Sequence, residues 1–450
     1  MKRCITAIWL LVFLLPIWAQ QPLTIDSCMQ LARQNNPQLR KSQLNVQRAE
    51  QVKAQAFTKY FPQIQGTGFA YHALHPLVEV GIEDIGNQSI RELLLLVYEN
   101  FGAEWGMPNS LNLFQHGYMF GVSALQPVFV GGKIIYGNRL AKVGVEAAKV
   151  QAQIDERDIL EQTEEAYWLV YGLQQKQYII DDAVALLDTL YETVNAAVNA
   201  GLALPSDLNQ VTIRRNEIAR KQLQLQSGIR LSRQALALAI NVPQDEIVIA
   251  QDYNLPAMRD TALTPAEDVV TPEHELLALQ MRAAELERKM VIADALPQIV
   301  LGANYSYSHL TAEMLKNGLG SKTGNGALFV TLQVPITGWW ETAHKLKEKR
   351  IAIEQAQIDA QYIGTQLDMR NQQAYDQWIE AEAMLRLQQQ VATQADEAYQ
   401  QTLANYQAGR VTIIDLLQAQ MTATQAAVDL TDAQIDYTIR LRRYNDLTQR

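Results

Sequence analysis

Cysteine is almost absent from this chain. The 450 residues include two cysteines, and Cys4 lies within residues 1–19, which have the features of a secretory signal. This segment starts with two basic residues, continues with a short apolar core and ends at Ala19, a small residue at a plausible cleavage site. Cys28 is then the only cysteine of the mature chain. This excludes an intrachain disulfide and argues against a thiol-based metal or catalytic centre.

The signatures of catalysis, nucleotide binding and metal binding are also missing. The sequence has no complete phosphate-binding loop, no HExxH motif and no nucleophile constellation, and Gly131-Gly132-Lys133 is better explained as a bend from a strand into a helix. His72 and His75 have no further ligands beside them, and no segment after the signal resembles a transmembrane helix. The net charge of −10 argues against a nucleic-acid partner. We therefore expect no enzyme, no cofactor and no metal.

Proline and glycine are scarce in one long stretch around which the chain is organised. No proline occurs between Pro127 and Pro205, and Gly172 is the only glycine between Gly144 and Gly201. A helix over this stretch would be about 100 Å long, several times the usual length, so it must pack against other rods. Part of it has the alternating three- and four-residue spacing of a coiled coil, at Ile180, Ala183, Leu187, Leu190, Val194 and Ala197.

The long stretch occurs twice in the sequence. A shift of 208 residues places Pro127 on Pro335 and Gly201 on Gly409, and the preceding helical segments match with a shift of 235 residues. We therefore predict two structural repeats. They cover residues 20–240 and 272–450, and a proline-rich, acidic connector covers 241–271.

Alternating apolar and polar residues predict four strands, at about 63–71, 118–126, 299–307 and 327–334. Each has one apolar face and one small or polar face, which is typical of a transmembrane β-strand and also of a half-buried strand in a soluble sheet. The two repeat shifts, 208 and 235 residues, differ by 27, so the first strand pair has the longer connection. We interpret residues 73–117 as a long loop with a short helix of its own.

Four strands are too few to enclose a lumen, and strands that span a bilayer must close into a barrel. Three copies of the chain would supply twelve strands, and the internal duplication would make their helices nearly six-fold symmetric. The predicted fold is therefore mainly α with a small membrane β part. Each chain adds four strands to a twelve-stranded trimeric β-barrel, and its long helices form an α-helical barrel.

In the order of its motifs the chain resembles the TolC-like outer-membrane efflux protein family. The resemblance rests on four segments, most of which recur in the second half: LTIDSCMQLARQNNPQLRKSQLNVQRAE, FPQIQGTG, PVFVGGK and the AGxxxxxDL turns. It implies a homotrimeric exit duct of a tripartite efflux or secretion system in the outer membrane of a Gram-negative-type bacterium, with most of the chain in the periplasm. The implied partners are a periplasmic adaptor (membrane fusion) protein, an inner-membrane transporter and outer-membrane lipid. A periplasmic coiled-coil adaptor or scaffold without a barrel is the alternative.

The resemblance also implies a gate at the two helical turns. It makes Asp415 a pore-facing carboxylate, repeated in each copy as a negative ring, and makes Arg410 and Asp207 a polar link between neighbouring turns. The family often has a second aspartate where this chain has Gln418. From the residues alone, the alternative for Asp415 is a helix-capping carboxylate, and the alternative for Arg410 and Asp207 is a pair of solvated charges.

Two further groups of residues are candidates for contacts outside the chain. The tips at which an adaptor would dock are Gly201, Leu202, Gly409 and Val411, although the glycines are also explained as helix C-caps. Trp339 and Trp340 directly follow the fourth strand. Aromatic rings at that position suit a membrane interface, with core packing as the alternative.

Overall fold

The computed structural model describes residues 22–75, 78–105, 110–250, 270–313 and 319–448. The predicted signal and most of the predicted connector lie outside these residues. The chain divides into two compact units, which are described separately. The hairpin unit comprises Met1–Gln47, Ala147–Ala278 and Ile358–Arg450, and the sheet unit comprises Arg48–Glu146 and Leu279–Gln357.

The described chain is mostly helical. Its helices are α2 (Ile25–Asn35), α3 (Pro37–Thr58), α4 (Gln88–Trp105), α5 (Lys133–Asn199), α6 (Pro205–Ile240), α7 (Pro272–Asp294), α8 (Gly338–Gln407) and α9 (Ile413–Thr448), with short 3-10 turns η1 (Ile82–Asp84) and η2 (Gln244–Glu246). None of the helices in these ranges combines the length and the apolarity that crossing a membrane requires. The strands are β1 (Gln63–His72), β2 (Val78–Gly81), β3 (Ser110–Val130), β4 (Gln298–Glu313) and β5 (Leu319–Gln333).

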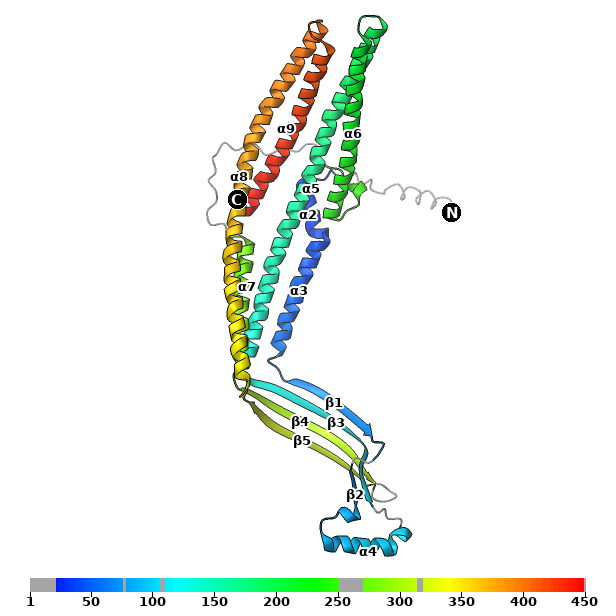
Figure 1. Cartoon of the computed structure of the whole chain (residues 1–450), viewed down its shortest axis with the longest axis vertical. Coiled ribbons are helices and arrows are strands. Elements are labelled where there is room, and N and C mark those ends of the chain that lie inside the picture. Colours follow the sequence, from blue (N-terminus) through cyan, green and yellow to red (C-terminus); the bar gives the residue numbers. More distant parts are fainter. Residues whose placement is uncertain (1–21, 76–77, 106–109, 251–269, 314–318, 449–450) are drawn as a thin grey trace, which may run out of the picture. The chain divides into compact units, whose positions relative to one another are not determined.

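The two long helices predicted from the scarcity of proline and glycine are confirmed. α5 has 67 residues and α8 has 70, so each is about 100 Å long. Each is followed by a returning helix, which gives the two hairpins α5–α6 and α8–α9 of Figure 1. A shift of 208 residues carries the bounds of α6, 205–240, onto those of α9, 413–448.

The core of the hairpin unit is divided into apolar clusters along the helices. Most of the predicted coiled-coil seam is buried, with Leu187 and Val194 each 2% exposed and Leu190 and Ala197 half-buried, and it packs against Leu416 and Leu417 of α9. Burying side chains of this size contributes roughly 1.5–3 kcal/mol each. Trp168 and Trp378 are fully buried in two other clusters, as expected for mid-helix tryptophans with a packing role.

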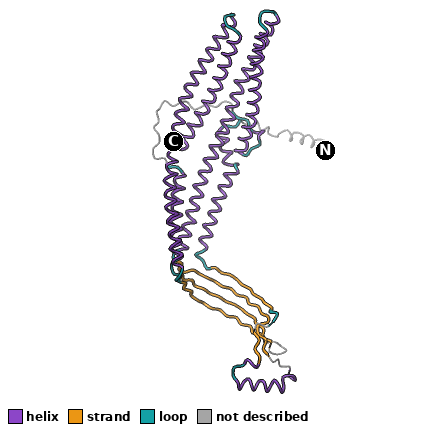
Figure 2. The backbone as a smooth tube through the Cα atoms, viewed as in Figure 1, coloured by secondary structure: helices purple, strands orange, loops and turns teal. Residues whose placement is uncertain are grey.

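The sheet unit contains one antiparallel sheet, drawn in orange in Figure 2. Its strand order is β1-β3-β4-β5, with β2 beside β3 (Figure 1). The register aligns the apolar residues of all four long strands on one face. They include Ile64, Val122, Ala124, Leu301, Ala303, Tyr305, Leu328, Val330 and Leu332. The opposite face is mostly polar or small, with Gln65, Thr67, Ser123, Asn304, Ser306, Thr331 and Gln333 beside larger exceptions such as Phe69 and Phe329.

The strands are longer than the sequence pattern predicts. β3 starts at Ser110 instead of about residue 118, and β5 starts at Leu319 instead of about residue 327. Part of the predicted loop 73–117 is therefore strand, and β2 pairs with β3 beyond the end of β1. Ladder hydrogen bonds use the backbone alone, so the start of β5, which is rich in glycine and polar residues, can pair without an alternating apolar pattern. The remainder of that loop includes α4.

Two glycines form the bend between β3 and α5, as predicted. Gly131 and Gly132 have φ angles of 63° and 85°, which favour glycine. A side chain on Gly131 would also overlap the backbone of Ala293. After the last strand, Trp339 and Trp340 are 57% and 80% exposed in the chain, so neither is a core residue of the single chain.

Candidate functional site

The turn of the first hairpin is built on a left-handed glycine. Gly201 has a φ of 72°, and no other atom lies within 4 Å of the position that its Cβ would take. The N–H of Leu202 donates to the carbonyl of Ala197 at 2.8 Å, and the N–H of Gly201 donates to that of Val198 at 3.0 Å. This is a Schellman cap, which requires a residue that tolerates positive φ. Glycine is needed here for its backbone angle and not for lack of space.

The turn of the second hairpin repeats this geometry. Gly409 has a φ of 70°, its N–H donates to the carbonyl of Tyr406 at 2.9 Å, and the N–H of Arg410 donates to that of Asn405 at 2.8 Å. The C-cap explanation of both glycines is therefore confirmed. At the first tip, Leu202 is 83% exposed, whereas Val411 at the second is half-buried.

Asp415 closes a capping box at the start of α9. Its Oδ2 accepts hydrogen bonds from the N–H and the hydroxyl of Thr412, at 2.9 and 2.6 Å, and the Thr412 hydroxyl oxygen accepts from the Asp415 N–H at 3.3 Å. The bonds from the Thr412 hydroxyl and N–H lower the pKa of Asp415. The carboxylate is fully exposed, so it combines a capping role with a negative charge that faces solvent.

The exposed side of α9 at this turn carries the predicted gate residues. Ile413, Leu416 and Leu417 are buried, whereas Asp415 and Gln418, three residues apart, are exposed. Asp415 and Gln418 therefore lie on the face of α9 that the chain itself leaves uncovered.

Asp207 occupies the corresponding place in the first hairpin. Its Oδ2 accepts a hydrogen bond from the N–H of Leu204 at 3.2 Å. The pKa of Tyr406 of α8 is raised mainly by burial and, to a smaller extent, by the negative charge of Asp207. The two turns are therefore close enough to interact electrostatically. Among the ion pairs of the described residues, none joins Arg410 to Asp207, and Arg410 is exposed. The predicted link between these two residues is therefore not made within one chain.

A cavity of about 260 Å³ lies between the hairpins near their turns. Leu187 and Leu190 of α5, Leu403 and Tyr406 of α8, and Leu416 of α9 line it. The lining is largely apolar, and the packing between the hairpins is therefore incomplete at this level.

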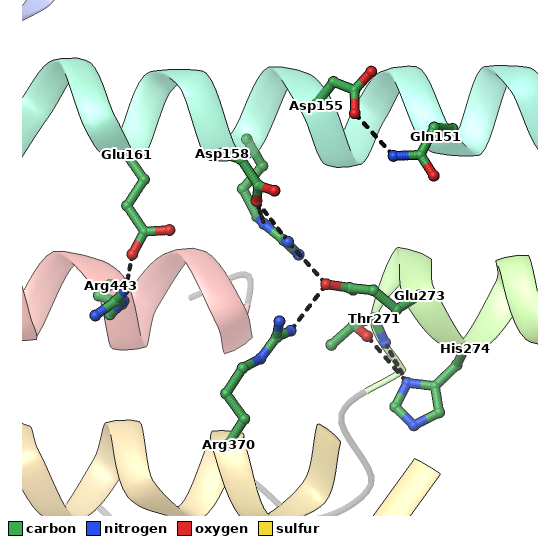
Figure 3. A network of polar contacts seen from close by, with 10 residues as sticks. Gln151, Asp155, Asp158, Glu161, Thr271, Glu273, His274, Arg370 and Arg443 are labelled. Carbon is green, nitrogen blue, oxygen red and sulfur yellow. Dashed lines mark hydrogen bonds and ion pairs between the residues drawn. The ribbon is translucent and has the colours of Figure 1, made fainter. Parts of the chain in front are cut away.

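Sequence reasoning missed a charged network farther from the turns (Figure 3). Glu273, in the first turn of α7, accepts hydrogen bonds through Oε1 from Arg157 of α5 at 2.8 Å and from Arg370 of α8 at 3.0 Å. Burial alone would raise the pKa of Glu273, but the bonds from Arg157 and Thr271 outweigh it and lower the pKa to about 2. The network borders a polar cavity of about 630 Å³. An acidic residue at a helix N-terminus was the one sequence signal, and it does not identify partners over 90 residues away.

A second set of charged contacts joins α5 to α9. Lys176 Nζ lies 2.5 Å from Asp432 Oδ1, Arg442 Nε lies 3.2 Å from Glu164 Oε2, and Arg443 pairs with Glu161. Glu164 is 5% exposed and also accepts a hydrogen bond from the Trp168 indole at 3.2 Å. Burial raises the pKa of Glu164 to about 7, against the opposing effects of Arg442 and Trp168.

Comparison of the sequence with known families decides the assignment. The family model for outer membrane efflux proteins matches residues 28–242 and 274–447. The chain belongs to the outer membrane efflux protein family. Membership locates the protein in the outer membrane with a periplasmic body, as the motif resemblance implied. The two matched segments also correspond to the two halves of the duplicated sequence.

One curated relative and two solved structures show how far this similarity extends to individual proteins. The outer membrane protein TolC of Vibrio cholerae is 22% identical over 281 residues, a match that covers 61% of this chain and 64% of TolC. Among solved structures, VceC of Vibrio cholerae has a TM-score of 0.72 at 15% identity and covers 94% of this chain and 95% of VceC. CmeC of Campylobacter jejuni has a TM-score of 0.71 at 14% identity, with 94% and 85% covered. These structures confirm the predicted mainly helical fold with its small antiparallel sheet.

Proposed function

We propose that this protein is the exit duct of a tripartite efflux or secretion system. It would be a passive homotrimeric channel that spans the outer membrane and the periplasm and is gated at its helical turns. The observation that carries the proposal is a sheet with one apolar face, one polar face and two unpaired edges. Such a duct performs no covalent chemistry and needs no cofactor, in keeping with the lack of catalytic motifs in the sequence.

The two free edges favour closure by further copies of the chain. In the described sheet, β1 pairs only with β3, and β5 pairs only with β4. Because every neighbouring pair is antiparallel, β1 and β5 run in opposite directions, so β1 of one copy can pair antiparallel with β5 of the next. Three copies would close twelve long strands without an exposed edge, as a bilayer requires.

The two faces of the sheet suit the two sides of a barrel wall. Leu328, Val330 and Tyr305 on the apolar face are 84%, 67% and 60% exposed in the single chain, and this face would meet lipid. The polar face would line the lumen. Trp339 and Trp340, exposed just beyond β5, would lie at the membrane interface.

The exposed charges of the turns support a gate between copies. The Asp415 carboxylates of the three copies would form a negative ring around the pore, which favours cations. Gln418 on the same face is uncharged, so it would add no second ring of charge. Arg410 and Asp207 would link neighbouring turns of different copies, since the single chain does not pair them. A partner can open such a gate only by binding the open form more tightly than the closed form.

The exposed tips support docking of an adaptor. Gly201 and Gly409 hold the turns in one conformation, and Leu202 and Val411 lie directly beside them. We expect a photo-crosslinker at Leu202 or Val411 to capture a periplasmic adaptor protein in cells and to co-purify an inner-membrane transporter. The same probe at Leu223 of α6, which is 68% exposed but distant from the turn, is the control. Equal capture at both positions would remove the tips from the docking site.

The alternative, a periplasmic coiled-coil adaptor or scaffold without a barrel, is disfavoured by membership of the outer membrane efflux protein family. It gives no reason for a sheet whose exposed face is apolar. Cell fractionation with crosslinking separates the two. We expect the protein in the outer-membrane fraction, with heat-modifiable migration on gels and crosslinked species of three copies. Recovery from the soluble periplasmic fraction would contradict the channel.

A further inference from the structure

Helices α5 and α9, which belong to different hairpins, meet at a glycine. Gly172 is the only glycine between Gly144 and Gly201, in the middle of α5. A Cβ on Gly172 would overlap Cδ1 of Ile435 and lie 3.8 Å from its Cγ1. The side chain of Ile435 therefore occupies the space that any other residue at position 172 would fill. A glycine inside a helix costs about 1 kcal/mol relative to alanine, and here it leaves room for the terminal methyl group of Ile435.

Ion pairs lie on both sides of this contact. The Lys176–Asp432 pair is one helical turn from Gly172, and the Glu164–Arg442 pair is about two turns away on the other side. The side chains of Lys176 and Glu164 are only 20% and 6% exposed. A slide of α9 along α5 would take Lys176, which is largely buried, away from its partner Asp432, and this is unfavourable. The contact therefore resists translation of α9.

The α5 side of the contact belongs to a well-packed body. Ile435 and Ile439 of α9 pack against a cluster from α2, α5 and α6 that includes the fully buried Trp168. Gly228 of α6 lies beside Leu173 of α5, and a Cβ at Gly228 would be in ordinary van der Waals contact with Leu173 Cδ1, at 3.6 Å. At this level, α9 is held by the helices of the first hairpin.

Toward the turns, contact between the hairpins becomes easier to break. From Ile180 onward the contact is an apolar cluster, and it includes the cavity of about 260 Å³ near Leu190 and Tyr406. On this side of the ion pairs, Lys221 of α6 and Gln425 of α9 make a weak polar contact at 3.4 Å. Separation of this part breaks no ion pair among the described residues.

We propose that the Gly172–Ile435 contact, with its flanking ion pairs, is the pivot about which the α8–α9 hairpin swings when the gate opens. The proposal rests on the proposed gate at the turns. Gly172 lies 28 residues before Ala200, or about 42 Å along the helix, so a swing of about 10° displaces the turns by roughly 7 Å. Small movements at the pivot are thereby converted into opening at the tips.

Crosslinks at two levels test the pivot. In a Cys28→Ser background, which removes the only other mature thiol, Gly172→Cys with Ile435→Cys gives a lock at the pivot. Leu190→Cys with Tyr406→Cys, joined by a short bismaleimide, gives a lock near the turns. Conductance is measured with Arg410→Ala and Asp415→Ala also present, so that the gate is open before crosslinking.

We expect the pivot lock to leave conductance within about twofold of the uncrosslinked protein and the tip lock to reduce it at least tenfold. Loss of conductance on locking Gly172 to Ile435 would show that α9 moves against α5 there and would overturn the pivot. Unchanged conductance with both locks would show that the hairpins do not separate, which also overturns it. If the gate substitutions raise no conductance before crosslinking, the proposed gate is wrong.

Hydrogen exchange tests the pivot whether or not the gate assignment holds. In the full chain we expect amides of residues 428–442 to exchange at least tenfold more slowly than those of 410–424. Gly172→Ala should raise exchange in 428–442, whereas Gly144→Ala in the same helix should not, because nothing lies within 4 Å of its Cβ position. Equal exchange in the two segments, or equal effects of the two substitutions, would overturn the pivot.

Discussion

The junction of α5, α7 and α8 depends on one carboxylate, and its removal gives the most quantitative prediction. Glu273→Gln keeps the size of the side chain but removes the charge that accepts from Arg157 and Arg370 at 2.8 and 3.0 Å. The pKa of Glu273 falls from 4.5 to about 2 on folding, a difference of roughly 3 kcal/mol in favour of the ionised form. The side chain retains 17% exposure, so we reduce this figure to about 2 kcal/mol.

Thermal unfolding of the purified protein in detergent, followed by circular dichroism, measures this effect. We expect Glu273→Gln to lower the melting temperature by about 2–4 °C at neutral pH. Glu275→Gln is the matched control, because Glu275 is exposed in the same turn of α7 and should change little.

The effect also has a defined pH dependence. Because folding lowers the pKa of Glu273, the stabilisation is fully present above about pH 4.5 and is lost as the pH falls toward about 2. The difference between wild type and Glu273→Gln should shrink over that interval. Equal melting temperatures at neutral pH, or a difference that does not depend on pH, would refute the role assigned to this carboxylate.

Three further predictions follow from single side chains. Burial raises the pKa of Glu164 to about 7, so the wild type should lose about 2–3 kcal/mol as the pH rises from about 4.5 to above 7, and Glu164→Gln should remove this loss in melting experiments. Trp340→Ser should remove part of the tryptophan quenching by brominated lipids without changing stability in detergent, whereas Trp378→Ser should leave quenching unchanged and destabilise the fold by about 3–5 kcal/mol. Thr412→Ala should bring the pKa of Asp415 back toward its usual value, as measured by NMR titration, and an unchanged pKa would contradict the capping box.

The helical part of the fold could be predicted from the sequence because its signals are local or repeated. The scarcity of proline and glycine predicted the ends of α5. The shift of 208 residues then predicted α8 and α9 in the second half of the chain. The ends of the strands could not be predicted in the same way. The start of β5 is a polar, glycine-containing segment whose pairing with β4 depends on backbone hydrogen bonds and not on side-chain alternation.

The candidate site was only partly predictable for a related physical reason. Gly201 and Gly409 could be located because a Schellman turn needs a positive φ, and this requirement favours glycine at one position of the sequence. Glu273 lies 116 positions from Arg157 and 97 positions from Arg370 in the sequence. Gly172 and Ile435, which contact each other, are 263 positions apart. Such contacts depend on how the hairpins pack, and no single segment carries a signal for them.

Conductance across planar bilayers tests the proposed channel and its gate most directly. We expect the wild-type protein to insert as discrete channels of small, cation-selective conductance. Arg410→Ala with Asp415→Ala should increase that conductance severalfold and weaken cation selectivity. Arg386→Ala with Asp376→Ala, a matched loss of charges on α8 away from the turns, should leave both unchanged. No channel activity from the wild type, or an equal conductance for the tip variant and the wild type, would contradict a channel gated at these turns.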